Sequence, residues 1–200
     1  VRDANSLETA AAEISVGTHP VQFVVCDVSK PETIPPMVEA VVAKAGRIDS
    51  LLNVAGVNIR KRVETYTEAE YDYITDINLK GAFLVAQAVG RQMIAQKTGG
   101  TIINIDSLNT FAPLKGVLPY AMSKAGLGMM TRGMGMEWGD HGIRVNAIAP
   151  GFVLTDLTNK LWSDPTMQAW GKANTPLRRL GQPEDMVGAD IFLGSDASRY

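Results

Sequence analysis

The chain has 200 residues, of which 46% are hydrophobic and 20% charged, so it is long enough to bury one sizeable core. Its net charge of −2 gives no electrostatic reason to expect nucleic acid or an anionic membrane as a partner. No apolar run reaches the roughly eighteen residues of a membrane span, and two histidines are too few to predict a metal site. A single cysteine excludes an intramolecular disulfide, which is typical of the cytoplasm.

Strands and helices alternate along the chain. It opens on a helical pattern of the kind that follows a second strand, and a short β-branched run at 21–26 predicts the next strand. Ser29 and Glu32 have the spacing of a capping box and predict a helix over 31–45. Apolar runs without alternation, typical of strands buried on both faces of a parallel sheet, predict further strands at 48–56, 101–106 and 143–150.

The remaining helices lie between and after these strands. Thr67 and Glu70 form a second capping-box pattern, which opens a helical stretch to about 96 with a break near Asn78. Two more helices are predicted over 120–140 and 183–194. This order predicts an α/β fold, a Rossmann-like doubly wound parallel sheet, in a single domain over 1–200.

The two ends of the sequence depart from that pattern. A dinucleotide-binding fold opens with a strand, a Gly-rich turn and a helix, and no such turn follows any predicted strand. We therefore expect the domain to lack its first strand and to be incomplete at both ends, with about 30 residues missing in front.

A tyrosine and a lysine lie four residues apart near the start of the helix at 120–140. Tyr120 and Lys124 share one helical face at this spacing. A tyrosine with a pKa of about 10 is a weak base near neutral pH, and a nearby ammonium lowers that pKa by favouring the phenolate. The pair therefore indicates acid/base chemistry on a hydroxyl or carbonyl group, although an amphipathic surface pair is the plainer alternative.

Five short motifs then occur in one order: NVAG (53–56), INLKG (77–81), INIDS (103–107), YAMSK (120–124) and NAIAPGFVLT (146–155). Together they resemble the short-chain dehydrogenases/reductases of the classical type, over essentially the whole chain. The resemblance implies a catalytic tetrad: Tyr120 as acid/base, Lys124 as its electrostatic partner, Ser107 as anchor of the substrate oxygen, and Asn78. The side chain or backbone of Asn78 would hold a water beside Lys124.

The same resemblance implies a site for a nicotinamide cofactor. Asp27 and Val28 match the residues that contact adenine, although Asp27 also suits a turn at a strand end. The other implied cofactor contacts are Asn53, Ala55, Gly56, Tyr120, Lys124, Pro150, Gly151, Val153 and Thr155. Arg2 lies about where an arginine would meet a 2′-phosphate, which favours NADP slightly and leaves NAD open.

Substrate and assembly are less specific. Residues 152–177 are expected to form a lid, and the basic loop Arg60–Lys61–Arg62 either attracts a substrate carboxylate or is simply solvated. This loop, together with the segments EWGDHGIRVNAI (137–148) and NTPLRRLGQPED (174–185), is similar to gluconate 5-dehydrogenases and related sugar-acid or sugar-alcohol enzymes, and also to 3-oxoacyl-carrier-protein reductases. The Met-rich helix at 120–140 is apolar on more than one face, which favours a homodimer or homotetramer over core packing alone.

The leading hypothesis is an NAD(P)-dependent oxidoreductase that interconverts a secondary alcohol and a ketone, on a sugar acid or polyol. The alternatives are a 3-oxoacyl-carrier-protein reductase, an epimerase or dehydratase built on the same tetrad, and a non-catalytic relative that acts through subunit association. The last follows from the missing Gly-rich turn, since without it no helix amino terminus meets the diphosphate.

Overall fold

The computed structural model describes residues 4–15 and 20–200, and a parallel sheet lies at its centre. The sheet has the order β1-β2-β3, formed by Ser50–Asn53 (β1), Gly100–Ile105 (β2) and Ile143–Ile148 (β3). In its register Asn53 lies opposite Asn104, and Ile105 opposite Ile148. Parallel strands joined through helices confirm the predicted α/β class.

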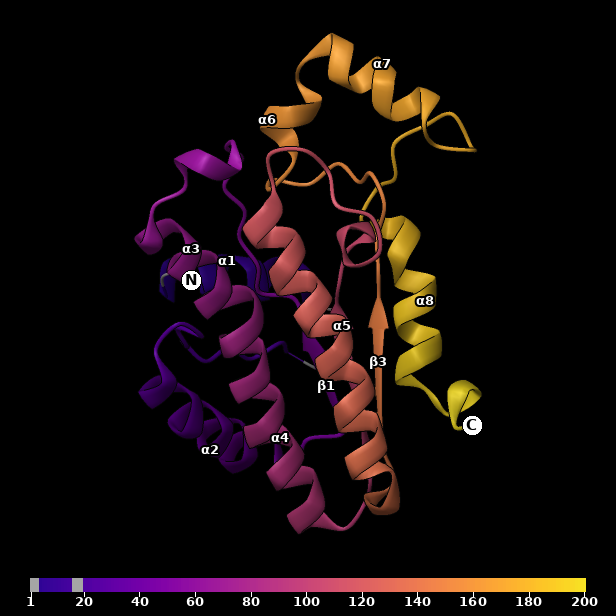
Figure 1. Cartoon of the computed structure of the whole chain (residues 1–200). Coiled ribbons are helices and arrows are strands. Elements are labelled where there is room, and N and C mark those ends of the chain that lie inside the picture. Colours follow the sequence, from indigo (N-terminus) through magenta and orange to yellow (C-terminus); the bar gives the residue numbers. More distant parts are fainter. Residues whose placement is uncertain (1–3, 16–19) are drawn as a thin grey trace.

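Helices cover both faces of this sheet (Figure 1). On one face lie α2 (Ile34–Ala45), α4 (Ala82–Gln96) and α5 (Leu118–Trp138). On the other, α8 (Glu184–Gly194) packs against β2 and β3. The remaining helices are α1 (Ala4–Ile14), α3 (Glu68–Thr75), α6 (Asn159–Trp162) and α7 (Pro165–Ala173). None of the helices in the described ranges is long and apolar enough to cross a membrane.

Strand β2 is the buried centre of the fold. Its residue Ile102 is fully buried in one hydrophobic cluster with Val89 and Met93 of α4 and Met134 of α5. Its neighbour Thr101 points the other way, and its hydroxyl donates to the Leu193 carbonyl of α8 at 3.3 Å. This alternation explains why the sequence of β2 is apolar or uncharged throughout.

The predicted capping box at Thr67 and Glu70 is confirmed. The Glu70 amide donates to the Thr67 hydroxyl at 3.2 Å, and the Glu70 carboxylate accepts from the Thr67 amide at 2.9 Å. The helix that starts here is interrupted by a π-helical turn over Asp76–Gly81 before α4 begins, which confirms the break near Asn78.

The expectations for 21–26 and for Ser29 were wrong. No strand forms at 21–26, because no neighbouring strand among the described residues supplies hydrogen bonds to that run. The Ser29 hydroxyl donates to Asp27 at 2.7 Å instead of capping a helix. A 3₁₀ turn over Pro31–Thr33 therefore precedes α2, and β1 and β3 are also shorter than predicted.

Candidate active site

The site is built at the edge of the sheet where all three parallel strands end. Asn53 is the last residue of β1, Ser107 lies two residues after β2, and Pro150 lies two residues after β3. The Pro150 carbonyl accepts from the Leu108 amide at 3.0 Å, which ties the second and third of these loops together. In open α/β sheets this carboxyl edge is where ligands bind.

The start of α5 brings the predicted pair to this edge. The Lys124 ammonium lies 5.8 Å from the centre of the Tyr120 ring, as the four-residue spacing predicts. Lys124 is only 4% exposed, and its ammonium donates to the Ile105 carbonyl at the end of β2 at 2.6 Å. The backbone of β2 therefore holds the lysine against the tyrosine.

Ser107 is buried beside Tyr120 and has a defined direction of hydrogen bonding. Its Oγ accepts from the Asn109 amide at 3.1 Å and from the Asn109 Nδ2 at 3.2 Å. With both lone pairs engaged, the Ser107 proton is free to be donated to Tyr120 or to a substrate oxygen. Asn109 was not among the predicted residues, and nothing in its sequence position marks it.

Asn78 reaches the same region from the π-helical turn. Its Oδ1 accepts from the Val57 amide at 2.7 Å, and its Nδ2 donates to the Val57 carbonyl at 2.9 Å and to the Ser123 hydroxyl at 3.1 Å. Two of these bonds hold the loop after β1, and the third ties Asn78 to α5. Both amide protons are engaged and Oδ1 keeps one lone pair, so a water held by the side chain or by the backbone of Asn78 stays a prediction.

Burial dominates the electrostatics of the pair. It lowers the pKa of Lys124 to about 8, with the Asp106 carboxylate acting in the opposite direction. Burial also raises the pKa of Tyr120, while the Ser107 hydroxyl opposes that rise. We expected Lys124 to lower the pKa of Tyr120, but in the chain without cofactor burial outweighs that effect, and the two groups titrate as a coupled pair.

A cavity of about 640 Å³ opens in front of Tyr120 and Ser107. One wall is the loop after β1, and the opposite wall is the segment from Gly151 to Trp162. Asn58 lines the cavity, and its Oδ1 is buried with no hydrogen-bond partner among the residues that the structure describes. The remaining lining residues come from these two segments and from the segment between β2 and α5: Ile59, Arg60, Leu108, Asn109, Leu114, Val117, Phe152, Val153, Leu157, Thr158, Lys160 and Leu161.

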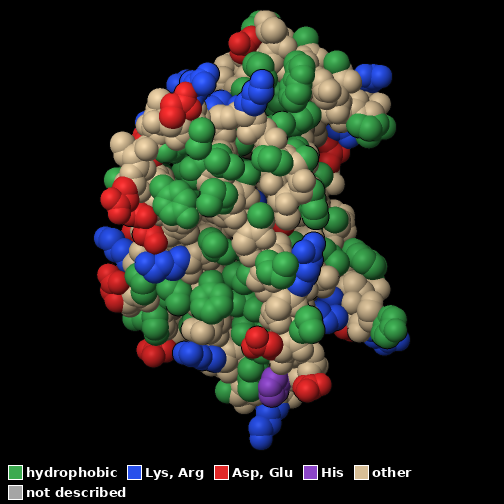
Figure 2. Space-filling model, viewed as in Figure 1, with side chains coloured by type: hydrophobic (Ala, Val, Ile, Leu, Met, Phe, Trp, Pro, Cys, Tyr) green, Lys and Arg blue, Asp and Glu red, His purple; other side chains and the backbone are tan. Residues whose placement is uncertain are grey.

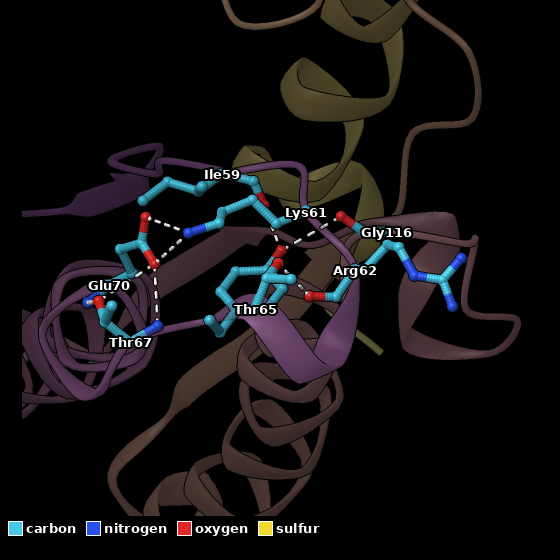
Figure 3. A network of polar contacts seen from close by, with 8 residues as sticks. Ile59, Lys61, Arg62, Thr65, Thr67, Glu70 and Gly116 are labelled. Carbon is cyan, nitrogen blue, oxygen red and sulfur yellow. Dashed lines mark hydrogen bonds and ion pairs between the residues drawn. The ribbon is translucent and has the colours of Figure 1, made fainter.

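The three basic residues of the loop after β1 have different environments. Lys61 forms an ion pair with Glu70 at 2.8 Å (Figure 3), and Arg62 forms one with Glu64. Arg60 donates to the Lys115 carbonyl at 2.8 Å and pairs with no carboxylate in the described part of the chain. Only Arg60 of the three lines the cavity, so the predicted basic loop reduces to one available cation.

The end of β1 leaves room for a cofactor to approach. The Asn53 side chain is occupied inside the fold, because its Nδ2 donates to the Ala82 carbonyl at 2.9 Å. Ala55 is exposed, and Gly56 has no side chain to separate Asn78 from Lys124. A Cβ at Gly151 would meet nothing within 4 Å. These small residues suit close approach by a ribose and a nicotinamide, so the site fits the predicted cofactor.

Asp27 and Val28, two more of the predicted cofactor residues, lie in a loop beside the π-helical turn. Asp27 accepts two hydrogen bonds from Ser29, of which the one from the hydroxyl does most to lower the pKa of its carboxyl. The Val28 carbonyl lies 2.6 Å from the position of a Cβ on Gly81, so this loop packs directly on the π-helical turn. Arg2, on which the predicted slight preference for NADP rested, lies outside the described residues.

The segment after β3 leads into the expected lid, where α6 and α7 project beyond the sheet (Figure 1). Val153 is buried, and its carbonyl accepts from the Trp162 indole at 3.1 Å. Phe152 packs against Trp162 and Trp170, with ring centres 5.5 and 5.2 Å apart. Thr155 is exposed and forms a hydrogen bond with Thr158, but Thr155 itself does not line the main cavity.

Comparison with known proteins places this geometry in context. The family model described as enoyl-(acyl carrier protein) reductase matches residues 1–200. The gluconate 5-dehydrogenase of Gluconobacter oxydans (strain 621H) is 34% identical over 199 residues, which cover 100% of this chain and 77% of that protein.

Two solved structures superimpose closely on the chain. One is a gluconate 5-dehydrogenase from Burkholderia cenocepacia J2315 in complex with NADP and tartrate, with a TM-score of 0.94 and 34% identity. The other is a short-chain type dehydrogenase/reductase from Mycobacterium marinum, with a TM-score of 0.93 and 32% identity. Each match covers 100% of this chain and 78% of the other.

Proposed function

The chain belongs to the short-chain dehydrogenase/reductase family and is an NAD(P)-dependent oxidoreductase that interconverts a secondary alcohol and a ketone; we propose that its substrate is a sugar acid. The observation that carries this proposal is Arg60, a cation without a carboxylate partner among the described residues, on the wall of the cavity that contains Tyr120 and Ser107. A guanidinium binds a carboxylate more strongly than it binds a neutral hydroxyl. The names of the relatives from Gluconobacter and Burkholderia support the same class.

In this proposal the tetrad manages the proton of the substrate. The nicotinamide accepts or supplies the hydride when it is bound. The Tyr120 hydroxyl gives its proton to the ketone oxygen in reduction, and the Tyr120 phenolate takes the proton of the alcohol in oxidation. Ser107 donates to the same oxygen, and Lys124 stabilises the phenolate while Asn78 holds the loop that carries Gly56.

The test compares a charged and a neutral substrate of similar size. Replacing Arg60 with Gln should raise the KM for D-gluconate by about 10- to 100-fold, the value of a hydrogen bond to a charged group. The KM for D-glucitol, which has no carboxylate, should not change. Arg62→Gln is the matched control, because Arg62 already pairs with Glu64, and it should leave both KM values unchanged. An equal loss for both substrates in Arg60→Gln would exclude the carboxylate contact.

The cofactor and its contacts form a second part of the proposal. We infer that NADP is preferred, because two solved neighbours carry NADP in their descriptions. Asn53, Ala55, Gly56, Pro150, Gly151, Val153 and Thr155 would surround it together with Asp27 and Val28, and 152–177 would close over it. Titration with NADPH and NADH, followed by nicotinamide fluorescence, tests the preference. A chain that is folded and binds neither would favour the non-catalytic alternative.

We also propose that α4 and α5 pack against a second copy of the chain in the cytoplasm. Met122, Met129 and Met136 are exposed at seven-residue spacing along one stripe of α5, and Met136 is 87% exposed. Figure 2 shows hydrophobic side chains gathered over these two helices. Met129→Lys should shift the mass measured by light scattering from dimer or tetramer towards monomer, and an unchanged mass would exclude this interface.

A further inference from the structure

The residue before Ser107 is a buried acid that the proposed mechanism does not use. Asp106 follows the last residue of β2 and is 5% exposed. Its amide donates to the Ile148 carbonyl at 2.7 Å, and its Oδ1 accepts from the Thr110 hydroxyl at 2.5 Å. The first contact fixes the backbone of Asp106 at the carboxyl edge of the sheet, and the second fixes its carboxylate, next in sequence to the catalytic serine.

Helix α5 comes unusually close to this carboxylate. A Cβ at Gly128 would lie 3.1 Å from the Asp106 Oδ2 and 2.9 Å from the Thr110 methyl group. Gly128 lies one helical turn after Lys124 and shares its face. The absence of a side chain at Gly128 therefore lets the acid lie beside the helix segment that carries the catalytic pair.

Few charges face this acid. From α5 these are Lys124 and Arg132, together with the phenol of Tyr120. The 3₁₀ turn Leu108–Thr110 and strands β1 and β2 contain no charged residue. In β3 the one charged residue is Arg144, which lies opposite Thr101 at the far end of the sheet. In the part of the chain that the structure describes, Asp106 is thus the negative charge that acts on the pair.

We propose that Asp106 is a positioning residue that sets the pH at which the Tyr120–Lys124 pair releases its proton. The proposal rests on the proposed function, in which that pair is the acid/base. A fixed negative charge opposes the loss of a proton from the pair, whichever of the two groups loses it. Asp106 therefore keeps the pair protonated to higher pH, which supports reduction near neutral pH and moves oxidation to alkaline pH.

The pKa directions agree with this geometry. The Asp106 carboxylate acts to raise the pKa of both Lys124 and Tyr120. At Tyr120 the Ser107 hydroxyl acts in the opposite direction. Its own pKa is raised by burial and held down by the Thr110 hydroxyl and the two cations. The hydroxyl and the cations favour the charged form, which is the form that acts on the pair.

Asp106→Asn is the test, because the amide keeps the shape and can still accept from Thr110. In this variant the apparent pKa of the rising limb of kcat/KM for D-gluconate oxidation should fall by about one unit. On that limb kcat/KM should therefore rise about tenfold at a given pH. Asp106→Ser, which removes the charge with a different side chain, should shift the limb in the same direction and serves if Asp106→Asn does not fold.

Two controls separate the possible failures. Thr110→Val removes one hydrogen bond, while Lys124 and Arg132 still favour the charged carboxylate of Asp106. The rising limb of this variant should therefore stay within about 0.3 pH units of that of the parent chain. Tyr120→Phe is assayed alongside, and if it still turns over, the proposed function fails and this inference with it. The other outcome is that Tyr120→Phe is inactive while a folded Asp106→Asn or Asp106→Ser variant keeps or raises the apparent pKa of the rising limb of kcat/KM. That result refutes only the role of Asp106.

Discussion

Lys124→Met should move the pH dependence of alcohol oxidation by about two units. The ammonium of Lys124 lies 5.8 Å from the centre of the Tyr120 ring. At an effective dielectric constant of about 20, a charge at that distance stabilises a phenolate by about 3 kcal/mol, or about two pKa units. Because the pKa of Lys124 is about 8, the intact pair can lose a proton near that pH.

Without the lysine, Tyr120 must ionise alone, and burial holds its pKa above the usual value of 10.0. The rising limb of kcat/KM should therefore move from near pH 8 to above pH 10, and kcat/KM at pH 7 should fall about 100-fold. Methionine is of similar length and apolar, so it fills the buried space that the lysine stem leaves.

The assay is the initial rate of NADPH formation from D-gluconate over a pH series, at saturating cofactor, with the dissociation constant for NADPH measured separately. Ser123→Ala is the matched control, because it perturbs a buried neighbour of Asn78 and leaves the charge of Lys124 in place. That variant is expected to change the height of the profile without moving its limb. A Lys124→Met profile that is lower at every pH but unshifted would refute the electrostatic role.

Three further predictions concern stability. Lys124→Met should raise the free energy of unfolding at pH 7 by up to about 3 kcal/mol, since burial of the charged lysine lowers its pKa to about 8. Because that pKa is depressed in the folded state, the gain should shrink between about pH 8 and 10.5, and a constant gain in chemical denaturation would contradict this origin. Gly90→Ala should lower the free energy of unfolding by about 1–3 kcal/mol, because its Cβ would lie 2.6 Å from the Trp138 ring. Gly133→Ala, whose Cβ would meet nothing within 4 Å, should leave the free energy of unfolding unchanged or raise it, as measured in urea titrations. Glu70→Gln should lower the unfolding midpoint above about pH 4.5, where the parent Glu70 is charged in the folded and the unfolded state. Because the folded chain lowers the pKa of Glu70 to about 2, the difference in midpoint from the parent chain should vanish as the pH falls towards 2. A difference in midpoint that does not depend on pH would refute the ionic contribution.

Local sequence signals predicted the helices and the buried strands well. They failed where the structure depends on which strand or side chain a segment bonds to. The β-branched run at 21–26 has every local property of a strand, but strand formation requires a neighbour, and none pairs with it among the described residues. Two capping-box patterns looked equivalent in the sequence. Thr67 forms its box, whereas Ser29 finds the Asp27 carboxylate two residues away and bonds to that instead.

The same limit applies to the candidate site. Spacing alone brought Tyr120 and Lys124 onto one face, because helix geometry is local. Which of three adjacent basic residues faces the cavity depended on the ion pair between Lys61 and Glu70 in the first turn of α3, and no spacing rule predicts that pairing. Asn58 and Asp106 were missed for a related reason. An amide without a partner and an acid behind a serine become visible only when burial and neighbours are known.

The glycines of α5 allow this helix to pack closely against the π-helical turn on one side and against the segment after β2 on the other. Glycine in a helix costs about 1 kcal/mol relative to alanine, so Gly126 and Gly128 weaken the helix on their own. Their Cβ positions would lie 2.8 Å from the Leu79 side chain and 2.9 Å from the Thr110 side chain, so alanine at either place requires that side chain or the helix to shift. A shift of the helix would separate Lys124 from the Ile105 carbonyl that holds it. The glycines therefore favour the close packing on which the electrostatic pair depends, and the helix recovers stability from apolar packing along its other residues.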